Sequence, residues 1–186
     1  MILGITGTIG AGKGTVVDYL VKEKGFTHYS VRESITEEIV RRGLEVNRTA
    51  MNEVATDLRR NNEPAYYTTL FMDRAAKDGV ENYIMESIRN VREAENIKAH
   101  GGFLLVVDAP EAVRYARIQN RGSATDSVTF EQFQAQEARE MTSENPSDPS
   151  YMNMRGVMDM SDATIVNDGT LEELHAKIEE ALATLH

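Results

Sequence analysis

Short apolar runs recur along the chain, and segments with helical periodicity separate them. The runs predict five strands, at residues 2–6, 27–31, 82–86, 103–108 and 163–167. Between them, apolar residues return at intervals of three or four, which is typical of amphipathic helices. Regular alternation of strands and helices is characteristic of α/β proteins with a parallel sheet. The pattern therefore predicts a three-layer α/β/α fold around a five-stranded parallel sheet.

Two segments are too long to be simple connections. Residues 32–81 form a mainly helical excursion between the second and third strands, and residues 122–160 form another between the fourth and fifth. Both follow carboxyl ends of strands, where ligands bind in open α/β sheets. Long insertions in compact domains are usually functional lids or disordered segments. We therefore expect one domain over residues 1–186, with a helical acceptor-binding insertion at 32–81 and a lid-like insertion at 122–160.

Composition favours small anionic ligands over polymers. The chain has 186 residues and a formal net charge of −10, which argues against nucleic-acid binding through a basic face. Its basic residues are 14 Arg and 6 Lys, and the planar fork of arginine matches phosphate oxygens. We expect small-molecule partners, with the protein acting as a monomer or a homodimer.

Several function classes are excluded or disfavoured by what the chain lacks. It has no cysteine, which excludes disulfides, thiol catalysis and cysteine–zinc sites. It enters its first predicted strand at once, without a cationic leader or a long apolar stretch. We therefore expect a cytoplasmic protein with no membrane partner.

A glycine-rich loop joins the first predicted strand to the first helix. Its candidate ATP-binding residues are Gly7, Thr8, Ile9, Gly10, Ala11, Gly12, Lys13, Gly14 and Thr15. The G-x-x-x-x-G-K spacing between a strand and a helix is that of a P-loop. Its glycines let backbone N–H groups point into one concavity at a helix N-terminus. Lys13 is expected to reach the outer phosphates and to be catalytic.

The metal site is less defined, because Gly14 stands where a strict Walker A loop has Ser or Thr. A Mg²⁺ ion would then depend on water, phosphate oxygens and a distant carboxylate, while Thr15 could donate to an inner phosphate. Glu86 ends the third strand and is the first candidate, acting through metal-bound water. Asp108 ends the more apolar fourth strand and is the alternative, although it could instead cap the next helix.

Arginines near the strand ends are candidates for phosphate binding. Arg89 follows Glu86 by three residues and can reach an acceptor phosphate. Arg114, Arg117 and Arg121 share one helix face, where three cations repel one another unless an anion lies among them. We expect Arg117 and Arg121 to contact the triphosphate.

Other arginines lie in the two insertions. Arg139 is the candidate catalytic residue of the lid. Arg48 and Arg59 are candidate acceptor ligands in the first insertion, where three more arginines have equal claims, namely Arg41, Arg42 and Arg60.

These motifs occur in the order seen in P-loop nucleotide kinases. The chain resembles that family over nearly its whole length, and most of all its adenylate-kinase-related and dephospho-CoA-kinase-like members. The resemblance implies the P-loop nucleoside triphosphate hydrolase fold of the nucleotide-kinase type, with ATP and Mg²⁺ as cofactors. It implies that Glu86 and Arg89 serve the metal and the acceptor, and that Arg117 and Arg121 serve ATP. It also implies that Asn167 and Gly169, after the last strand, contact adenine.

The chain departs from the family pattern near the acceptor. Glu86-Ser87 replaces the Asp-Gly that usually precedes the acceptor arginine in adenylate kinases. Their second strand is commonly followed by an arginine that binds the acceptor phosphate; here Ser30 and Arg32 come earlier, and Thr36 stands in its place. We expect Ser30 and Arg32 to contribute to acceptor binding, but the sequence leaves the acceptor open.

Three hypotheses follow. The first is an ATP-dependent phosphotransferase that moves the γ-phosphoryl group to a ribo- or deoxyribonucleoside monophosphate. The second is a dephospho-CoA kinase. The third, from another class, is an ATP-binding regulatory switch without phosphotransfer, which would need no acceptor arginines. A further alternative, a kinase of an uncharged alcohol, would need a general-base Asp instead of several acceptor arginines.

Overall fold

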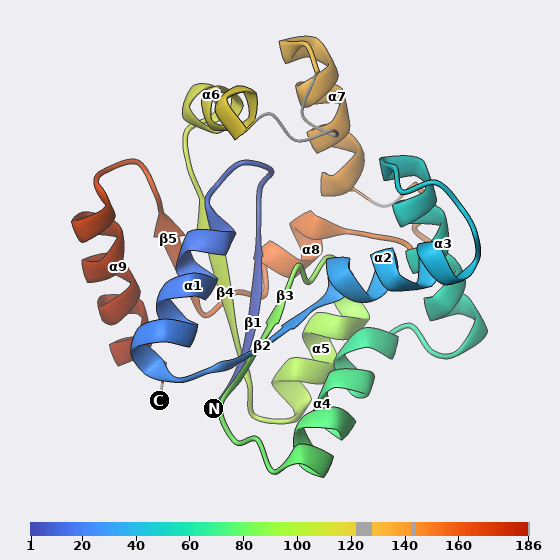
Figure 1. The fold of residues 1–186 in the computed structure, drawn as a ribbon, viewed down its shortest axis with the longest axis horizontal. Coiled ribbons are helices and arrows are strands. Elements are labelled where there is room, and N and C mark those ends of the chain that lie inside the picture. The colour runs from blue at the N-terminus through green and yellow to red at the C-terminus, as the bar shows by residue number, and fades with distance from the viewer. Residues whose placement is uncertain (122–127, 143, 186) are drawn as a thin grey trace.

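A parallel five-stranded sheet forms the centre of the protein (Figure 1). The computed structural model describes residues 1–121, 128–142 and 144–185. The strands are β1 (Ile2–Gly7), β2 (Thr27–Ser30), β3 (Tyr83–Glu86), β4 (Phe103–Asp108) and β5 (Ala163–Val166). Their spatial order is β2-β3-β1-β4-β5, and every neighbouring pair is parallel. The predicted α/β/α fold is confirmed, with strand ends shifted by a residue at most.

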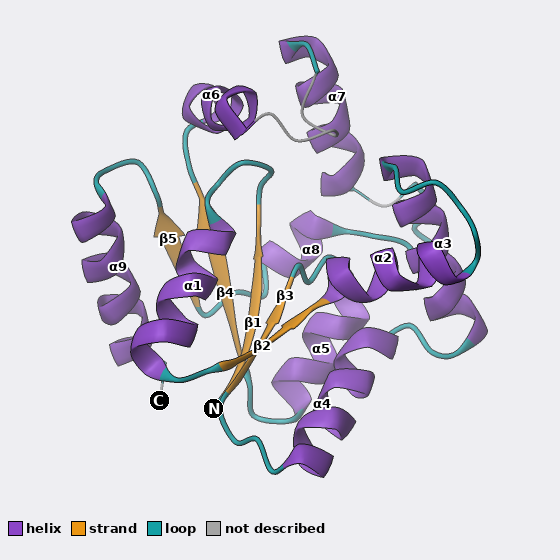
Figure 2. Cartoon of the chain, viewed as in Figure 1, coloured by secondary structure: helices purple, strands orange, loops and turns teal. Residues whose placement is uncertain are grey.

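Helices cover both faces of the sheet (Figure 2). One face carries α1 (Lys13–Lys24) and α9 (Leu171–Thr184), and the other carries α4 (Tyr66–Asp78), α5 (Val91–Ala99) and α8 (Met154–Met158). The remaining helices lie beyond the carboxyl ends of the strands: α2 (Val31–Arg41), α3 (Arg48–Asn61), α6 (Glu111–Arg121) and α7 (Phe130–Met141). Among the described residues, no helix is long and apolar enough to cross a membrane.

Each face of the sheet has its own hydrophobic core, because strand side chains alternate between the two faces. Leu3 and Ile5 of β1 point toward α1 and α9, where Leu20 and Ile178 enclose them. On the opposite face, an added Cβ at Gly4 would lie 2.6 Å from Cδ1 of Ile97. The bare backbone at this position lets α5 approach the sheet closely.

The two long insertions differ in how much of each is described. Residues 32–81 contain α2, α3 and α4, so the predicted helical excursion is confirmed. The second insertion contains α7, which begins with a capping box between Thr129 and Gln132, and α8. Residues 122–127 and 143 of that insertion lie outside the described part. Helices α2, α3, α6 and α7 all lie beyond the end of the sheet from which the glycine-rich loop leaves (Figure 1).

Candidate active site

The glycine-rich loop leaves the carboxyl end of the central strand β1. At Gly7 an added Cβ would lie 1.9 Å from the carbonyl oxygen of Val107, and at Gly12 it would lie 2.3 Å from Nδ2 of Asn167. Gly12 has a φ of 94° and precedes α1 without a side-chain cap. The first N–H groups of a helix have no intrahelical acceptor, so this loop forms an anion-binding cradle.

Lys13 folds back over the loop. Its Nζ donates to the carbonyl oxygens of Gly7 and Thr8, at 2.8 and 2.9 Å. Burial of the ammonium group and then the nearby Arg89 guanidinium lower the pKa of Lys13 to about 8, although Glu86 and Glu140 partly oppose them. The cation is thus poorly compensated in this conformation, and an anion in the cradle would stabilise it.

Two carboxylates end the strands that flank β1. Glu86 lies in register with Ile5, is half-buried and accepts a hydrogen bond from Oγ of Ser87 at 2.7 Å. Asp108 uses Oδ1 to accept from the hydroxyl of Thr8 at 2.5 Å and from the backbone N–H of Ala109 at 2.8 Å. Glu86 lines the cavity described below, whereas Asp108 holds the loop.

The strand end also turns Arg89 toward the site. Ser87 has a φ of 72°, a conformation that residues other than glycine seldom adopt. The N–H groups of Ser87 and Ile88 both donate to the carbonyl oxygen of Ile5, at 3.0 and 3.1 Å. This local strain sits beside the glycine-rich loop, where strained residues often accompany function.

No group of three or more His, Asp or Glu side chains that could hold a metal ion occurs in residues 1–121, 128–142 and 144–185. Glu86 and Thr15 nevertheless both line the cavity at the mouth of the loop. Mg²⁺ takes oxygen donors and usually keeps several waters while it is bound by one or two carboxylates and substrate phosphates. The residues present therefore fit a Mg²⁺ ion that arrives with a nucleotide.

Helix α6 supplies cations to the loop. Arg117 donates to the backbone oxygens of Asn167 and Ala11, at 3.0 and 3.5 Å. The amide of Asn167 donates to the same Ala11 oxygen at 2.8 Å. Arg121 lines the cavity on the same helix, while Gly169 is exposed and does not. The structure thus places Arg117 and Asn167 against the loop and Arg121 at the cavity, while their contacts with a nucleotide stay predictions.

Arg114 has a structural role that the sequence did not predict. Its buried guanidinium donates to the backbone oxygens of Ala109 and Ile9, pairs with Glu137 of α7, and lies over the ring of Phe133. The signal was its place on the face that carries Arg117. Arg114 therefore connects the glycine-rich loop to helix α7.

A cavity of about 480 Å³ extends from the loop to α2 and α3. Its far side is apolar and includes Val31, Ile35, Met51, Ala55 and Met152. Among the residues that the structure describes, two carboxylates line it, Glu86 and Glu140, and seven cationic side chains do: Lys13, Arg32, Arg48, Arg59, Arg89, Arg117 and Arg121. In a chain whose net charge is −10, this concentration of positive charge favours an anionic ligand.

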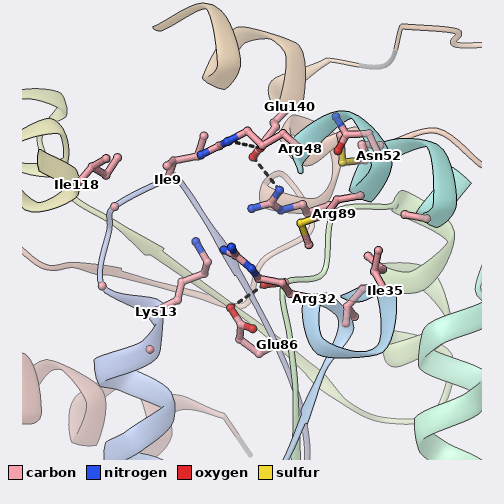
Figure 3. Close-up of a pocket in the computed structure, with 18 of the residues that line it drawn as sticks. Ile9, Lys13, Arg32, Ile35, Arg48, Asn52, Glu86, Arg89, Ile118 and Glu140 are labelled. Atoms are coloured by element: carbon pink, nitrogen blue, oxygen red, sulfur yellow. Dashed lines mark hydrogen bonds and ion pairs between the residues drawn. The ribbon is translucent and has the colours of Figure 1, made fainter. Parts of the chain in front are cut away.

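Arg48 and Arg89 meet above the loop although they come from different segments (Figure 3). Both contact Glu140, the penultimate residue of α7. Arg48 Nη1 lies 3.3 Å from Oε1 of Glu140, and Arg89 Nη1 lies 2.9 Å from Oε2. Arg32 also lines this cavity, from the first turn of α2. Four predicted acceptor ligands therefore line one cavity: Arg32, Arg48, Arg59 and Arg89.

Three predicted site residues have different roles in the structure. Arg59 is 2% exposed, pairs with the fully buried Glu93 at 2.8 Å and lies over the ring of Tyr67, so its charge is already compensated at the cavity wall. Arg139 does not line the cavity; it is exposed and pairs with Glu144. Ser30 caps α2 by accepting from the N–H of Glu33.

Together, the sheet order, the loop and the cavity define a P-loop nucleotide-binding protein with the fold of P-loop kinases. A family model described as an AAA domain matches residues 3–143. The chain belongs to this P-loop family and to the UPF0200 proteins. A UPF0200 protein of Pyrobaculum aerophilum is 30% identical in an alignment of 187 residues that covers 99% of this chain and 98% of the relative. A UPF0200 protein of Thermococcus kodakarensis is 27% identical over 188 residues, covering 97% and 95% of the two chains.

Solved structures agree on the fold. The shikimate kinase of Bacteroides thetaiotaomicron has a TM-score of 0.60 at 11% identity, covering 100% of this chain and 98% of that one. The shikimate kinase of Aquifex aeolicus has a TM-score of 0.53 at 17% identity, covering 100% and 96%. The resemblance to P-loop kinases is thereby confirmed as a likeness of fold.

Proposed function

We propose that this protein is an ATP-dependent phosphotransferase that moves the γ-phosphoryl group to a ribo- or deoxyribonucleoside monophosphate. One observation carries the proposal: Arg32, Arg48 and Arg89 face the P-loop across a single cavity. The loop, Lys13 and Arg117 suffice to bind a triphosphate. A second group of guanidinium side chains beyond them is what an acceptor with its own phosphate requires.

The donor side of the cavity would bind ATP. The loop N–H groups and Lys13 would hold the outer phosphates, and Arg117 and Arg121 would neutralise charge along the triphosphate. A Mg²⁺ ion bound with the nucleotide would neutralise phosphate oxygens, with Glu86 and Thr15 holding its water ligands. Lys13 would leave the carbonyl oxygens of Gly7 and Thr8, which are weaker partners than phosphate.

The acceptor side would position the second nucleotide. Arg48 and Arg89 would bind its phosphate, and the apolar wall formed by Val31, Ile35 and Met51 would contact its nucleoside. Phosphoryl transfer needs little covalent chemistry from the protein, so alignment and charge neutralisation would supply most of the rate enhancement. A cavity of about 480 Å³ lies within the usual range for small-ligand sites.

A regulatory switch would have the same loop but no use for this acceptor group. Arg48 comes from α3 and Arg89 from the end of β3, so two separate segments converge on one point. That convergence favours a transferase over a switch. It does not separate a nucleoside monophosphate from dephospho-CoA, which also has a phosphate.

The test is an ATP-consumption assay against all ribo- and deoxyribonucleoside monophosphates, dephospho-CoA and shikimate. We expect one or a few nucleoside monophosphates to stimulate ATP consumption and to appear as diphosphates. The Lys13→Ala variant should lose this activity by orders of magnitude. Slow ATP hydrolysis that no acceptor stimulates would contradict the proposal and favour the switch.

A further inference from the structure

Helix α7 places one buried carboxylate between the arginines of the acceptor site (Figure 3). Glu140 is 6% exposed, and its two oxygens contact Arg48 and Arg89 at 3.3 and 2.9 Å. A carboxylate taken out of water is tolerated only when cations or hydrogen bonds compensate it. Here the compensating cations are the two that the proposed function assigns to the acceptor phosphate. The carboxylate therefore stands where that phosphate would bind.

We propose that Glu140 is an internal competitor that makes this site selective for phosphomonoesters over carboxylates, an inference that rests on the proposed acceptor site. A free carboxylate offers the arginines the same charge and the same two oxygens as Glu140. It lacks the high effective concentration of a group fixed to the protein, so it loses the competition. A phosphomonoester offers about two negative charges and three terminal oxygens, so it displaces Glu140.

The geometry of α7 allows Glu140 to leave without undocking the whole helix. Glu137, one turn earlier, is held by Arg114, and Phe133 is fully buried against Ile9 and Ile118. Glu140 is the last residue but one of the helix, where helices fray most easily. The chain beyond it includes the exposed stretch 144–147. Release of Glu140 therefore needs movement of the helix end only.

Calorimetric titration of simple anions tests the proposal without knowledge of the acceptor. The protein is first saturated with the non-hydrolysable analogue AMP-PNP and Mg²⁺, which fills the P-loop, and is then titrated with inorganic phosphate or with acetate. We expect Glu140→Gln to bind phosphate at least about tenfold more tightly than wild type, as for the removal of one charged competitor. Acetate should bind measurably to Glu140→Gln and not to wild type.

Glu144→Gln is the matched control. It removes the same charge and also breaks a glutamate–arginine pair, with Arg139, but outside the cavity. Its phosphate and acetate affinities should equal those of wild type. Phosphate binding by Glu140→Gln that is no tighter than wild type, at an unchanged thermal midpoint, would overturn the proposal, because Glu140 would then support the site instead of competing for it.

A second variant covers the case in which Glu140→Gln does not fold. Glu140→Asp keeps the charge but is one methylene shorter, so it cannot contact both arginines as closely. Its phosphate affinity should exceed that of wild type, and equality would contradict the inference.

The outcome is separable from that of the proposed function. Tighter phosphate binding without any phosphoryl transfer would keep the competitor and reject the transferase. Phosphoryl transfer by the wild type, with phosphate binding unaltered in Glu140→Gln, would keep the transferase and reject the competitor.

Discussion

Nucleotide binding should take up a proton through Lys13. In the free protein, burial and the neighbouring Arg89 guanidinium hold the pKa of Lys13 near 8. Phosphates placed in the loop would add negative charge beside the ammonium group and return its pKa toward the ordinary value of about 10.4. At pH values between these two pKa values, Lys13 is mostly deprotonated in the free protein and mostly protonated in the complex.

The size of the uptake follows from the pKa of about 8 in the free protein. At pH 8.5 about a quarter of free Lys13 is protonated, so binding should take up roughly 0.7 proton, against about 0.1 at pH 7. The sign follows from the raised pKa of the complex. The affinity for the nucleotide is highest at pH values below the pKa of Lys13 in the free protein. As the pH rises through 8, the affinity falls, and the loss approaches tenfold for each pH unit.

Calorimetry of AMP-PNP and Mg²⁺ binding at pH 8.5, in buffers of different ionisation enthalpy, measures the uptake directly. The Lys13→Met variant should show almost none. Arg89→Ala should show less than wild type, because loss of the guanidinium raises the pKa of Lys13 in the free protein. An uptake near zero in wild type, or one that survives in Lys13→Met, would refute the assignment of Lys13 as the titrating phosphate ligand.

Two further substitutions separate roles among the arginines. Arg89→Ala should weaken the binding of the nucleoside monophosphate found by the assay about ten- to a hundredfold and spare ATP, while Arg117→Ala should weaken ATP; calorimetry checks both, and weakening of ATP alone in both variants would remove the acceptor site from Arg89. Arg59→Met should lower the free energy of unfolding by about 3–5 kcal/mol because it leaves Glu93 buried and unpaired. Urea denaturation measures this loss, and the control is Arg60→Met, a substitution at an exposed neighbour that should change the free energy of unfolding little. Equal losses in the two variants would contradict the destabilisation expected from an unpaired Glu93.

The fold was predictable because buried parallel strands are continuous apolar runs that a sequence displays directly. Strand order was not, since nothing local states which strands pair. Glu86 and Asp108 illustrate the consequence. Sequence left open which of them neighbours the P-loop strand, and the structure places β3 and β4 on either side of β1. Only the hydrogen bond from Thr8 shows that Asp108 is committed to the loop.

The P-loop was also predictable from local sequence, because its glycines, its lysine and its flanking strand and helix are adjacent in the chain. The arginines were harder, because their partners are distant in sequence: Arg48 and Glu140 are 92 residues apart. Helical spacing held an unused clue. Glu140 follows Phe133 by seven residues, on the buried face of α7, whereas Arg139 points outward. Likewise Arg59 lies four residues after the buried Ala55 and so shares its face of α3, whereas Arg60 lies outside that spacing.

The small apolar cluster beneath α7 limits how much of the site can move. Phe133 is fully buried against Ile9 of the loop and Ile118 of α6, and burial of such a side chain is worth about 1.5–3 kcal/mol. A form of the protein with α7 undocked would therefore be populated at about one molecule in ten to one in a hundred and fifty. Movement of the helix end alone leaves this cluster intact and does not carry that cost.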